Sequence, residues 1–224
     1  MTVRRLNHAV LYVRDLSRSI DFYRDILNFD VVMEMGGRAA FLRADGSVND
    51  HDLGLISVDR AGASDAGLST VGLYHLAWEV DKLRDLQELE RRLAAASALV
   101  GASDHGTTKS LYAHDPDGLE FEIVWVVPAD LLDEAALAGR VRRGPLDIAH
   151  EMTRYGADTL GGCESARRSP AAKQTLPNKP SGSANSRQHI DTADAHGPHV
   201  TNEIIRAVRG ADQPVMDSDM TRKA

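Results

Sequence analysis

The sequence has a single cysteine, no long apolar run and no excess of basic residues. Cys163 is the only cysteine among 224 residues, which excludes an internal disulfide and a cysteine-based zinc site. No run of about 18 apolar residues occurs, and the first residues lack the apolar centre of a signal peptide. The formal net charge of -7 offers no clustered basic face for phosphates, so nucleic acid is not an expected partner. We expect a soluble cytoplasmic chain that does not enter a membrane.

Aromatic residues are missing from the C-terminal part of the chain. All eleven Phe, Trp and Tyr residues lie between Tyr12 and Tyr155. From about Gly156 onward the chain is rich in Ser, Ala, Asn, Asp, Pro and Gly, and such a segment buries too little apolar surface to offset the entropy lost on ordering. The sequence therefore predicts a folded domain over residues 1–155 and a disordered tail over 156–224.

The first 128 residues contain one pattern twice. Each copy is predicted to hold a strand, an amphipathic helix preceded by an aspartate cap (Asp15 or Asp81), and three more strands, which makes a βαβββ unit. The predicted strands are residues 6–13, 31–35, 38–43 and 53–58 in the first copy, and 73–80, 98–103, 110–114 and 119–127 in the second. An offset of 67 residues superposes the two copies by placing His75 on His8.

This duplication predicts an α+β fold of two paired modules, at about residues 1–66 and 67–128. One module alone would leave an open, curled sheet with an uncovered face, so pairing the modules into a curled mixed sheet is the natural way to bury that face. Two helices are expected over residues 130–141 and 145–155, which form a helical extension over 129–155 at the mouth of the pocket.

Two histidines and a glutamate are the candidate metal ligands. His8 and His75 occupy equivalent positions, and a pseudo-twofold axis between the modules would bring them together around one ion. Glu120 and Glu122 point to the same side of a strand, so alternation cannot choose between them as the third ligand. Two imidazoles and one carboxylate form the facial triad of non-haem Fe(II), which leaves positions open for substrate and dioxygen.

Residues 5–127 resemble the vicinal oxygen chelate superfamily, which includes glyoxalase I, the bleomycin and fosfomycin resistance proteins and the type I extradiol dioxygenases. The resemblance implies that the first strand of each module supplies a histidine ligand. It also implies that the glutamate ligand follows an Asp-Pro-x-Gly turn, which here spans residues 115–118. The implied ligand set around the metal site is His8, His75 and Glu122.

A longer signature is most similar to that of the extradiol enzymes. It consists of His105, the Leu111-Tyr112 pair, the turn at 115–118 and Glu122. The segment around His51 likewise resembles the extradiol segment that carries an acid/base histidine. The resemblance implies that His51 acts as general base and then acid, and that Tyr112 donates a hydrogen bond to the substrate. It also implies that His105 assists the reaction without contacting the substrate directly.

The repeat offset gives a test between subfamilies. Glyoxalase I completes its metal site with a ligand on the last strand of the first module, and the offset of 67 carries Glu122 back to Leu55. Leucine cannot bind a metal, so three protein ligands would remain and the ion would keep vacancies for dioxygen.

The expected function is an Fe(II)-dependent extradiol ring-cleaving dioxygenase of aromatic compound catabolism. Its expected substrates are a catechol-like diol and dioxygen, and a homodimer is expected because modules commonly pack or exchange between chains in this superfamily. One alternative is a glyoxalase-like lyase, isomerase or thiol transferase that uses Mn, Ni or Zn and consumes no oxygen. Another is a non-catalytic module that sequesters a drug, which would bind an aromatic ligand without metal.

Overall fold

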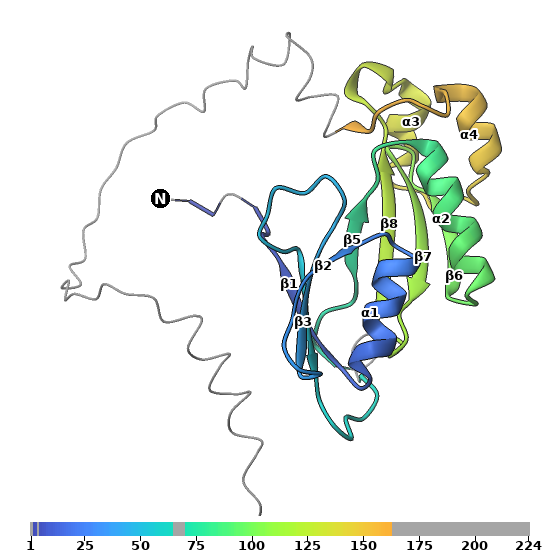
Figure 1. Cartoon of the computed structure of the whole chain (residues 1–224). Coiled ribbons are helices and arrows are strands. Elements are labelled where there is room, and N and C mark those ends of the chain that lie inside the picture. The colour runs from blue at the N-terminus through green and yellow to red at the C-terminus, as the bar shows by residue number, and fades with distance from the viewer. Residues whose placement is uncertain (1, 4, 65–69, 163–224) are drawn as a thin grey trace, which may run out of the picture. The chain divides into compact units, whose positions relative to one another are not determined.

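The computed structural model describes residues 2–3, 5–64 and 70–162, which belong to one compact unit, Met1–Leu176. Two mixed four-stranded sheets, each with one helix after its first strand, make up most of this unit (Figure 1). The predicted α+β fold of two βαβββ modules is therefore confirmed. Most of the predicted tail, residues 163–224, lies outside the described residues.

The first module forms a sheet with the strand order β1-β4-β3-β2. Its strands are β1 (Ala9–Val13), β2 (Asp30–Glu34), β3 (Ala39–Arg43) and β4 (Leu53–Ser57). β1 runs parallel to β4, and the other pairs are antiparallel. Helix α1 (Leu16–Asp25) follows β1, and the Asp15 carboxylate caps it as predicted by accepting a hydrogen bond from the Arg18 amide at 3.0 Å.

The second module repeats this topology in the order β5-β8-β7-β6. Its strands are β5 (Leu76–Glu79), β6 (Leu99–Asp104), β7 (Thr108–His114) and β8 (Glu120–Val126).

Helix α2 (Leu83–Ala95) has Lys82 at its N-cap position and no side-chain cap. The expected cap was wrong because Asp81 lies one residue too early, and its backbone carbonyl instead accepts a hydrogen bond from Gly161.

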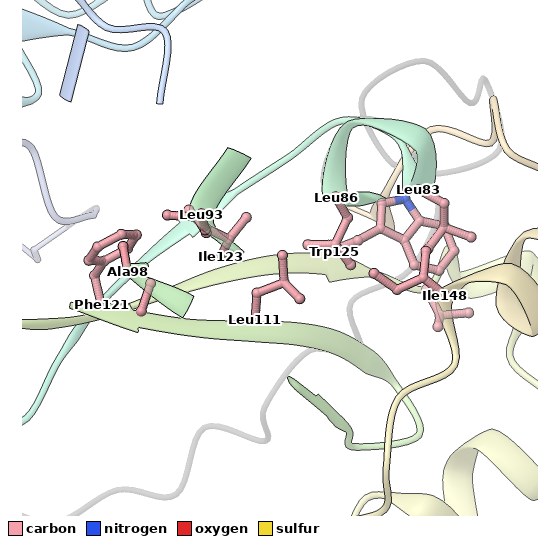
Figure 2. Packing of buried hydrophobic residues seen from close by; sticks show 11 residues of the cluster. Leu83, Leu86, Leu93, Ala98, Leu111, Phe121, Ile123, Trp125 and Ile148 are labelled. Atoms are coloured by element: carbon pink, nitrogen blue, oxygen red, sulfur yellow. The ribbon is translucent and has the colours of Figure 1, made fainter. Parts of the chain in front are cut away.

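Each sheet buries one face under helices. In the first module, Leu11, Leu42, Leu53 and Leu55 pack with the apolar side of α1. In the second, side chains of β7 and β8 pack against α2 and the C-terminal helix α4, and Figure 2 shows Trp125 beside Leu86 and Ile148, and Ile123 beside Leu93. Because side chains alternate along a strand, the opposite face of each sheet carries the remaining side chains.

The two modules correspond with a one-residue difference at their last strands. Val10 pairs with Gly54 in the first sheet, and its repeat equivalent Ala77 pairs with Glu122 in the second. The structural equivalent of Glu122 is therefore Gly54, at an offset of 68, and Leu55 points into the core. The register behind the Leu55 comparison was wrong, although Gly54, like leucine, has no side chain that could bind a metal.

The C-terminal segment packs on the second module. It contains a short 3-10 helix (Ala129–Leu131), α3 (Glu134–Gly139) and α4 (Ile148–Tyr155), capped at α3 by Asp133 and at α4 by Asp147. The two predicted helices are present but shorter. Residues 156–162 also pack there, since the Trp125 indole donates to the Thr159 carbonyl at 3.2 Å, so order continues beyond 155. Within the described ranges, no helix is both long and apolar enough to span a membrane.

The first module contacts the turn that precedes β8. Arg14 forms an ion pair of 2.6 Å with Asp117, and its backbone amide donates to the same carboxylate at 3.1 Å. The ring of Phe22 in α1 meets Phe121 edge-on at 6.0 Å. These contacts fix the second module against the helix of the first, while the open faces of both sheets lie elsewhere.

Candidate functional site

The polar half of the candidate site lies on the open face of the second sheet. Tyr112 on β7 pairs with Glu122 on β8, and Glu122 pairs with Ala77 on β5, so these three side chains share that face. His75 comes directly before β5, because the strand begins at Leu76 and not at residue 73. The strand ladder thus gathers residues that are far apart in the sequence.

His75 and Glu122 lie in direct contact. Nε2 of His75 is 3.2 Å from Oε2 of Glu122, and both side chains are mostly buried. Two atoms that bind one ion at about 2.1 Å are roughly 3.0 to 3.4 Å apart when their bonds make octahedral or tetrahedral angles. The observed separation is in that range, so these two groups fit a shared metal ion without rearrangement.

Tyr112 is positioned beside this pair by His105. Its hydroxyl lies 2.9 Å from Nε2 of His105, and its ring centroid lies 6.0 Å from that of His75. Burial, and next the negative charge of Glu122, raise the pKa of Tyr112. The hydroxyl therefore stays protonated at neutral pH and keeps its capacity to donate a hydrogen bond. The Arg143 guanidinium lies 5.8 Å from the centre of the same ring.

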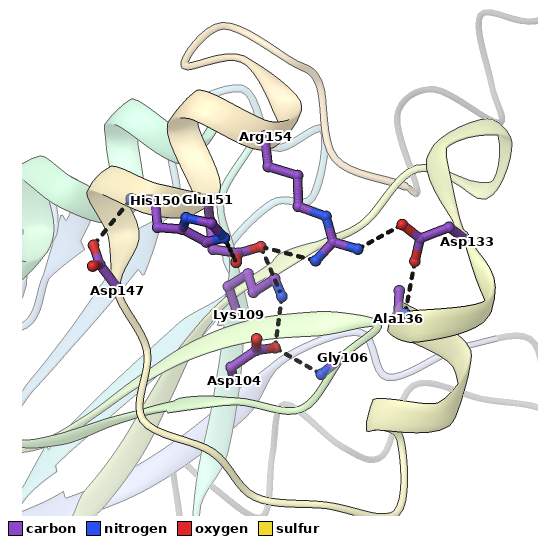
Figure 3. A network of polar contacts seen from close by, with 9 residues as sticks. All are labelled: Asp104, Gly106, Lys109, Asp133, Ala136, Asp147, His150, Glu151 and Arg154. Carbon is purple, nitrogen blue, oxygen red and sulfur yellow. Dashed lines mark hydrogen bonds and ion pairs between the residues drawn. The ribbon is translucent and has the colours of Figure 1, made fainter.

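A buried ion network holds the turn that carries His105. Lys109, which is fully buried, lies 2.6 Å from Asp104 and 2.9 Å from Glu151 of α4 (Figure 3). The same Asp104 oxygen accepts a hydrogen bond from the Gly106 amide at 2.7 Å, which fixes the turn between β6 and β7. Helix α4 therefore supports the site from the far side of the sheet.

The second group of predicted site residues lies at the first sheet. The ring centroids of His8 and His51 are 4.6 Å apart, and the ring of Phe41 on β3 lies 4.9 Å from His51. Nδ1 of His8 is 2.8 Å from the Asn7 side-chain oxygen, and Nδ1 of His51 is 2.9 Å from the Asp50 carboxylate. Both rings have their Nδ1 contact within the protein, an arrangement in which the Nε2 atom can serve a ligand.

The structure thus brings the six predicted residues together as three pairs. His75 lies with Glu122, His105 with Tyr112, and His8 with His51. Among the described residues, no three His, Cys, Asp or Glu side chains are grouped so that they could hold a metal ion. The physical reason is that His8 lies beside the first sheet and His75 beside the second. Contacts of α1 with the second module hold the two sheets in this arrangement.

Sequence reasoning gave little weight to three neighbours of the site. Glu120 lies 4.0 Å from Nδ1 of His75 and 3.8 Å from Nε2 of His114. The hydrogen bond to Glu120 raises the pKa of Tyr74. The sequence of one strand does not predict that Glu120 pairs with His114 across β8 and β7. The alternation of Glu120 and Glu122 did indicate that both carboxylates lie on the same face.

A cavity of about 580 Å³ lies where the modules meet, between residues of the first module and β5 and β8 of the second. Its lining includes Leu11, Tyr23, Trp78 and Phe121, together with Tyr74, His114 and Glu120. None of the six predicted site residues lines this cavity, but their neighbours Tyr74, His114 and Glu120 do.

Comparison with known proteins supports the same assignment of family. The sequence pattern of the Glyoxalase/Bleomycin resistance protein/Dioxygenase superfamily matches residues 5–123. Over 123 residues the chain is 30% identical to the catechol-2,3-dioxygenase of Bacillus subtilis (strain 168), which covers 53% of this chain and 40% of that protein. Over 126 residues it is 35% identical to biphenyl-2,3-diol 1,2-dioxygenase 3 of Rhodococcus globerulus. This match covers 55% of this chain and 64% of that protein.

A solved structure, that of a glyoxylase/bleomycin resistance protein/dioxygenase domain from Frankia sp. EAN1pec, is 26% identical, with a TM-score of 0.46, and the match covers 56% of this chain and 99% of that one. The chain spans less than two thirds of the length of either curated relative. From the match over residues 5–123 and the duplicated βαβββ modules, we conclude that the chain belongs to the glyoxalase/bleomycin resistance protein/dioxygenase superfamily.

Proposed function

We propose that this protein is an Fe(II)-dependent extradiol dioxygenase that cleaves the ring of a catechol-like aromatic diol. The observation that carries the proposal is the His75–Glu122 contact of 3.2 Å with Tyr112 and His105 beside it on one sheet face. The names of the two curated relatives, a catechol and a biphenyl-diol dioxygenase, support the choice of an aromatic diol. The single cysteine supports a reducing, cytoplasmic setting.

His8, His75 and Glu122 would hold the metal, and Mn, Ni or Zn are the alternatives to iron. The donor set fits, because two neutral imidazoles and a carboxylate are the ligands of non-haem Fe(II) oxygenases. When bound, the ion would lower the pKa of a coordinated hydroxyl group and leave positions for the diol and dioxygen.

The other side chains have separate tasks. His51 would take the proton from a substrate hydroxyl group and later return it, since histidine is the side chain that most often serves as general acid and base. Tyr112 would donate a hydrogen bond to a substrate oxygen, since its raised pKa keeps the hydroxyl protonated. His105, at 2.9 Å from the Tyr112 hydroxyl, would orient that donor.

A second copy of the chain would complete the site. His8 and His51 lie at the first sheet, and His75 and Glu122 lie at the second. The ion pair between Arg14 and Asp117 opposes a movement of the two sheets toward each other within one chain. The open face of the first sheet is apolar, with Val10, Tyr12 and Met33 all exposed. Burial of this face against the second sheet of a partner copy would join the two halves in a homodimer.

The function is tested by reconstituting the apoprotein with Fe(II) without oxygen and then measuring oxygen uptake with a panel of catechols. We expect uptake and a yellow ring-opened product, both lost in the His75→Ala and Glu122→Ala variants. If no diol supports oxygen uptake while His8→Ala still loses bound metal, a lyase or isomerase is favoured instead. If the metal-free protein binds aromatic ligands tightly and turns none over, the drug-sequestering alternative is favoured.

The shared site is tested by mixing two inactive variants. In a shared dimer, His8→Ala and His75→Ala chains form heterodimers with one intact site out of two, so mixing restores metal binding and activity after subunit exchange. A site built within one chain gives no recovery, because each chain lacks one ligand of its own. Sedimentation analysis of the wild-type chain checks that dimers are present.

A further inference from the structure

The His75 ring lies between two carboxylates that are two residues apart on β8. Nε2 faces Glu122 at 3.2 Å, and Nδ1 faces Glu120 at 4.0 Å. Nδ1 is buried and has no hydrogen-bond partner among the described residues. Since alternate residues of a strand share one side, Glu120 and Glu122 flank the ring from the same face of the sheet.

Metal binding changes what each ring nitrogen requires. A neutral imidazole carries one proton, and the nitrogen that binds a metal must offer its lone pair. If Nε2 binds the ion next to Glu122, the proton has to be on Nδ1. A buried N–H group without an acceptor is unfavourable, so Nδ1 then needs a hydrogen-bond partner.

Glu120 is the carboxylate on that side of the ring and is itself held in place. It is 21% exposed, it accepts the hydrogen bond of Tyr74, and it lies 3.8 Å from Nε2 of His114. A side-chain movement of about 1 Å would bring its oxygen from 4.0 Å to hydrogen-bond distance from Nδ1.

We infer that Glu120 is a positioning residue that accepts the Nδ1 proton of His75 and so holds Nε2 toward the metal ion. The inference rests on the proposed metal centre and deepens it, because it gives the two carboxylates different tasks: Glu122 binds the ion, and Glu120 orients the histidine. Partners of this kind fix the tautomer and the orientation of histidine ligands, and their loss typically weakens metal binding by about 10- to 100-fold.

The test is a Mn(II) titration of the metal-free full-length chain. We expect Glu120→Ala to bind Mn(II) about 10- to 100-fold more weakly than the wild type. Glu120→Gln keeps an acceptor oxygen and should recover part of that loss. The matched control is Glu79→Gln, a carboxylate at the end of β5 that is exposed, and it should leave the affinity unchanged.

Two outcomes would overturn the inference. Wild-type affinity in Glu120→Ala would make Glu120 a bystander. Complete loss of Mn(II) binding in Glu120→Ala together with retention in Glu122→Ala would make Glu120 the ligand itself.

The nitrogen NMR shifts of His75 separate this inference from the proposed function. In metal-free Glu122→Ala, the proton of His75 should be on Nδ1, toward Glu120, and further substitution of Glu120 by Ala should abolish that preference. A proton that stays on Nε2 in Glu122→Ala contradicts the role of Glu120. A wild-type chain that binds no metal overturns the metal centre instead, whatever the tautomer.

Discussion

The hydroxyl group of Tyr23, in the helix of the first module, donates a hydrogen bond of 3.2 Å to Asp115, in the turn that precedes β8 of the second module. Burial raises the pKa of both groups, and the nearby Asp115 charge raises that of Tyr23 further. Asp115 also accepts hydrogen bonds from the amides of Asp117 and Leu119 at 2.9 Å. One buried carboxylate thus joins the two modules and shapes the turn that leads to Glu122.

Replacement of Tyr23 by Phe should lower the free energy of unfolding by about 1.5 to 3 kcal/mol, the usual contribution of a hydrogen bond to a charged group. The ring remains, so packing in the core is kept. Urea unfolding measures the loss, and a double-mutant cycle with Asp115→Asn isolates the pair. Additive effects of the two substitutions would show that the contact contributes nothing of its own.

Replacement of Lys109 by Met should destabilise the fold by about 3 to 5 kcal/mol, because it leaves the carboxylates of Asp104 and Glu151 without their buried cation. The matched control is Lys82→Met. Lys82 is partly exposed and lies 3.9 Å from Asp158, so this substitution should cost less than about 1 kcal/mol. Equal effects of the two substitutions in thermal unfolding would contradict a buried network.

Replacement of Gly106 by Ala should dislodge α3 from the turn that carries His105. Gly106 has a φ of +75°, and an added Cβ would overlap the Ala136 carbonyl oxygen and lie 2.8 Å from Gly139. Gly46→Ala is the control, since Gly46 has a nearly equal φ of +73° and no atom within 4 Å of an added Cβ.

The control should lose only the backbone term of about 1 to 2 kcal/mol. Gly106→Ala should lose more and should also increase hydrogen exchange in α3. If both alanine variants show the same stability and exchange, the contact between the turn and α3 has no energetic weight.

Asp133 gives a stability term that depends on pH. Hydrogen bonds from the Ala136 amide and then from Arg154 lower the pKa of Asp133 below its ordinary 3.8. A carboxylate with a lowered pKa stabilises the folded state above pH 3.8, and this contribution is lost as the pH falls through the folded-state value. Asp133→Asn keeps a capping oxygen but cannot ionise.

We therefore expect the difference in unfolding temperature between wild type and Asp133→Asn to shrink as the pH falls from 7 to 3. A constant difference over this range would mean that the charge of Asp133 does not contribute. Because the side chain is largely exposed, the effect should be small and should decrease with added salt.

Much of the local structure followed from the sequence because it depends on neighbours in the chain. Runs of β-prone residues bounded by turn residues predicted all eight strands within a few residues, and Asp15 was a correct helix cap. The strand starts were less accurate: His8 and His75 precede β1 and β5 rather than lying inside them. Strand ends depend on pairing with other strands, which a local pattern does not contain.

The candidate site divides in the same way. The family resemblance predicted Glu122 after the turn at residues 115–118, and it predicted roles for His105 and Tyr112, which lie 2.9 Å apart. Lys109 was not identified, because a lysine in a strand gives no sign that α4 will place Glu151 over it. Glu120 was recognised only as an alternative to Glu122, and its place beside the second nitrogen of His75 came from the packing of β5 on β8.

The sequence by itself determined the two βαβββ modules and the chemistry of their side chains, since hydrophobic period and residue type are properties of short segments. Only the tertiary structure decided which side chains meet. The one-residue difference between Gly54 and Leu55 arises from strand pairing. The separation of His8 from His75 arises because Arg14 and Tyr23 fix the first module against a turn of the second, and such contacts between distant residues leave no periodic signal in the chain.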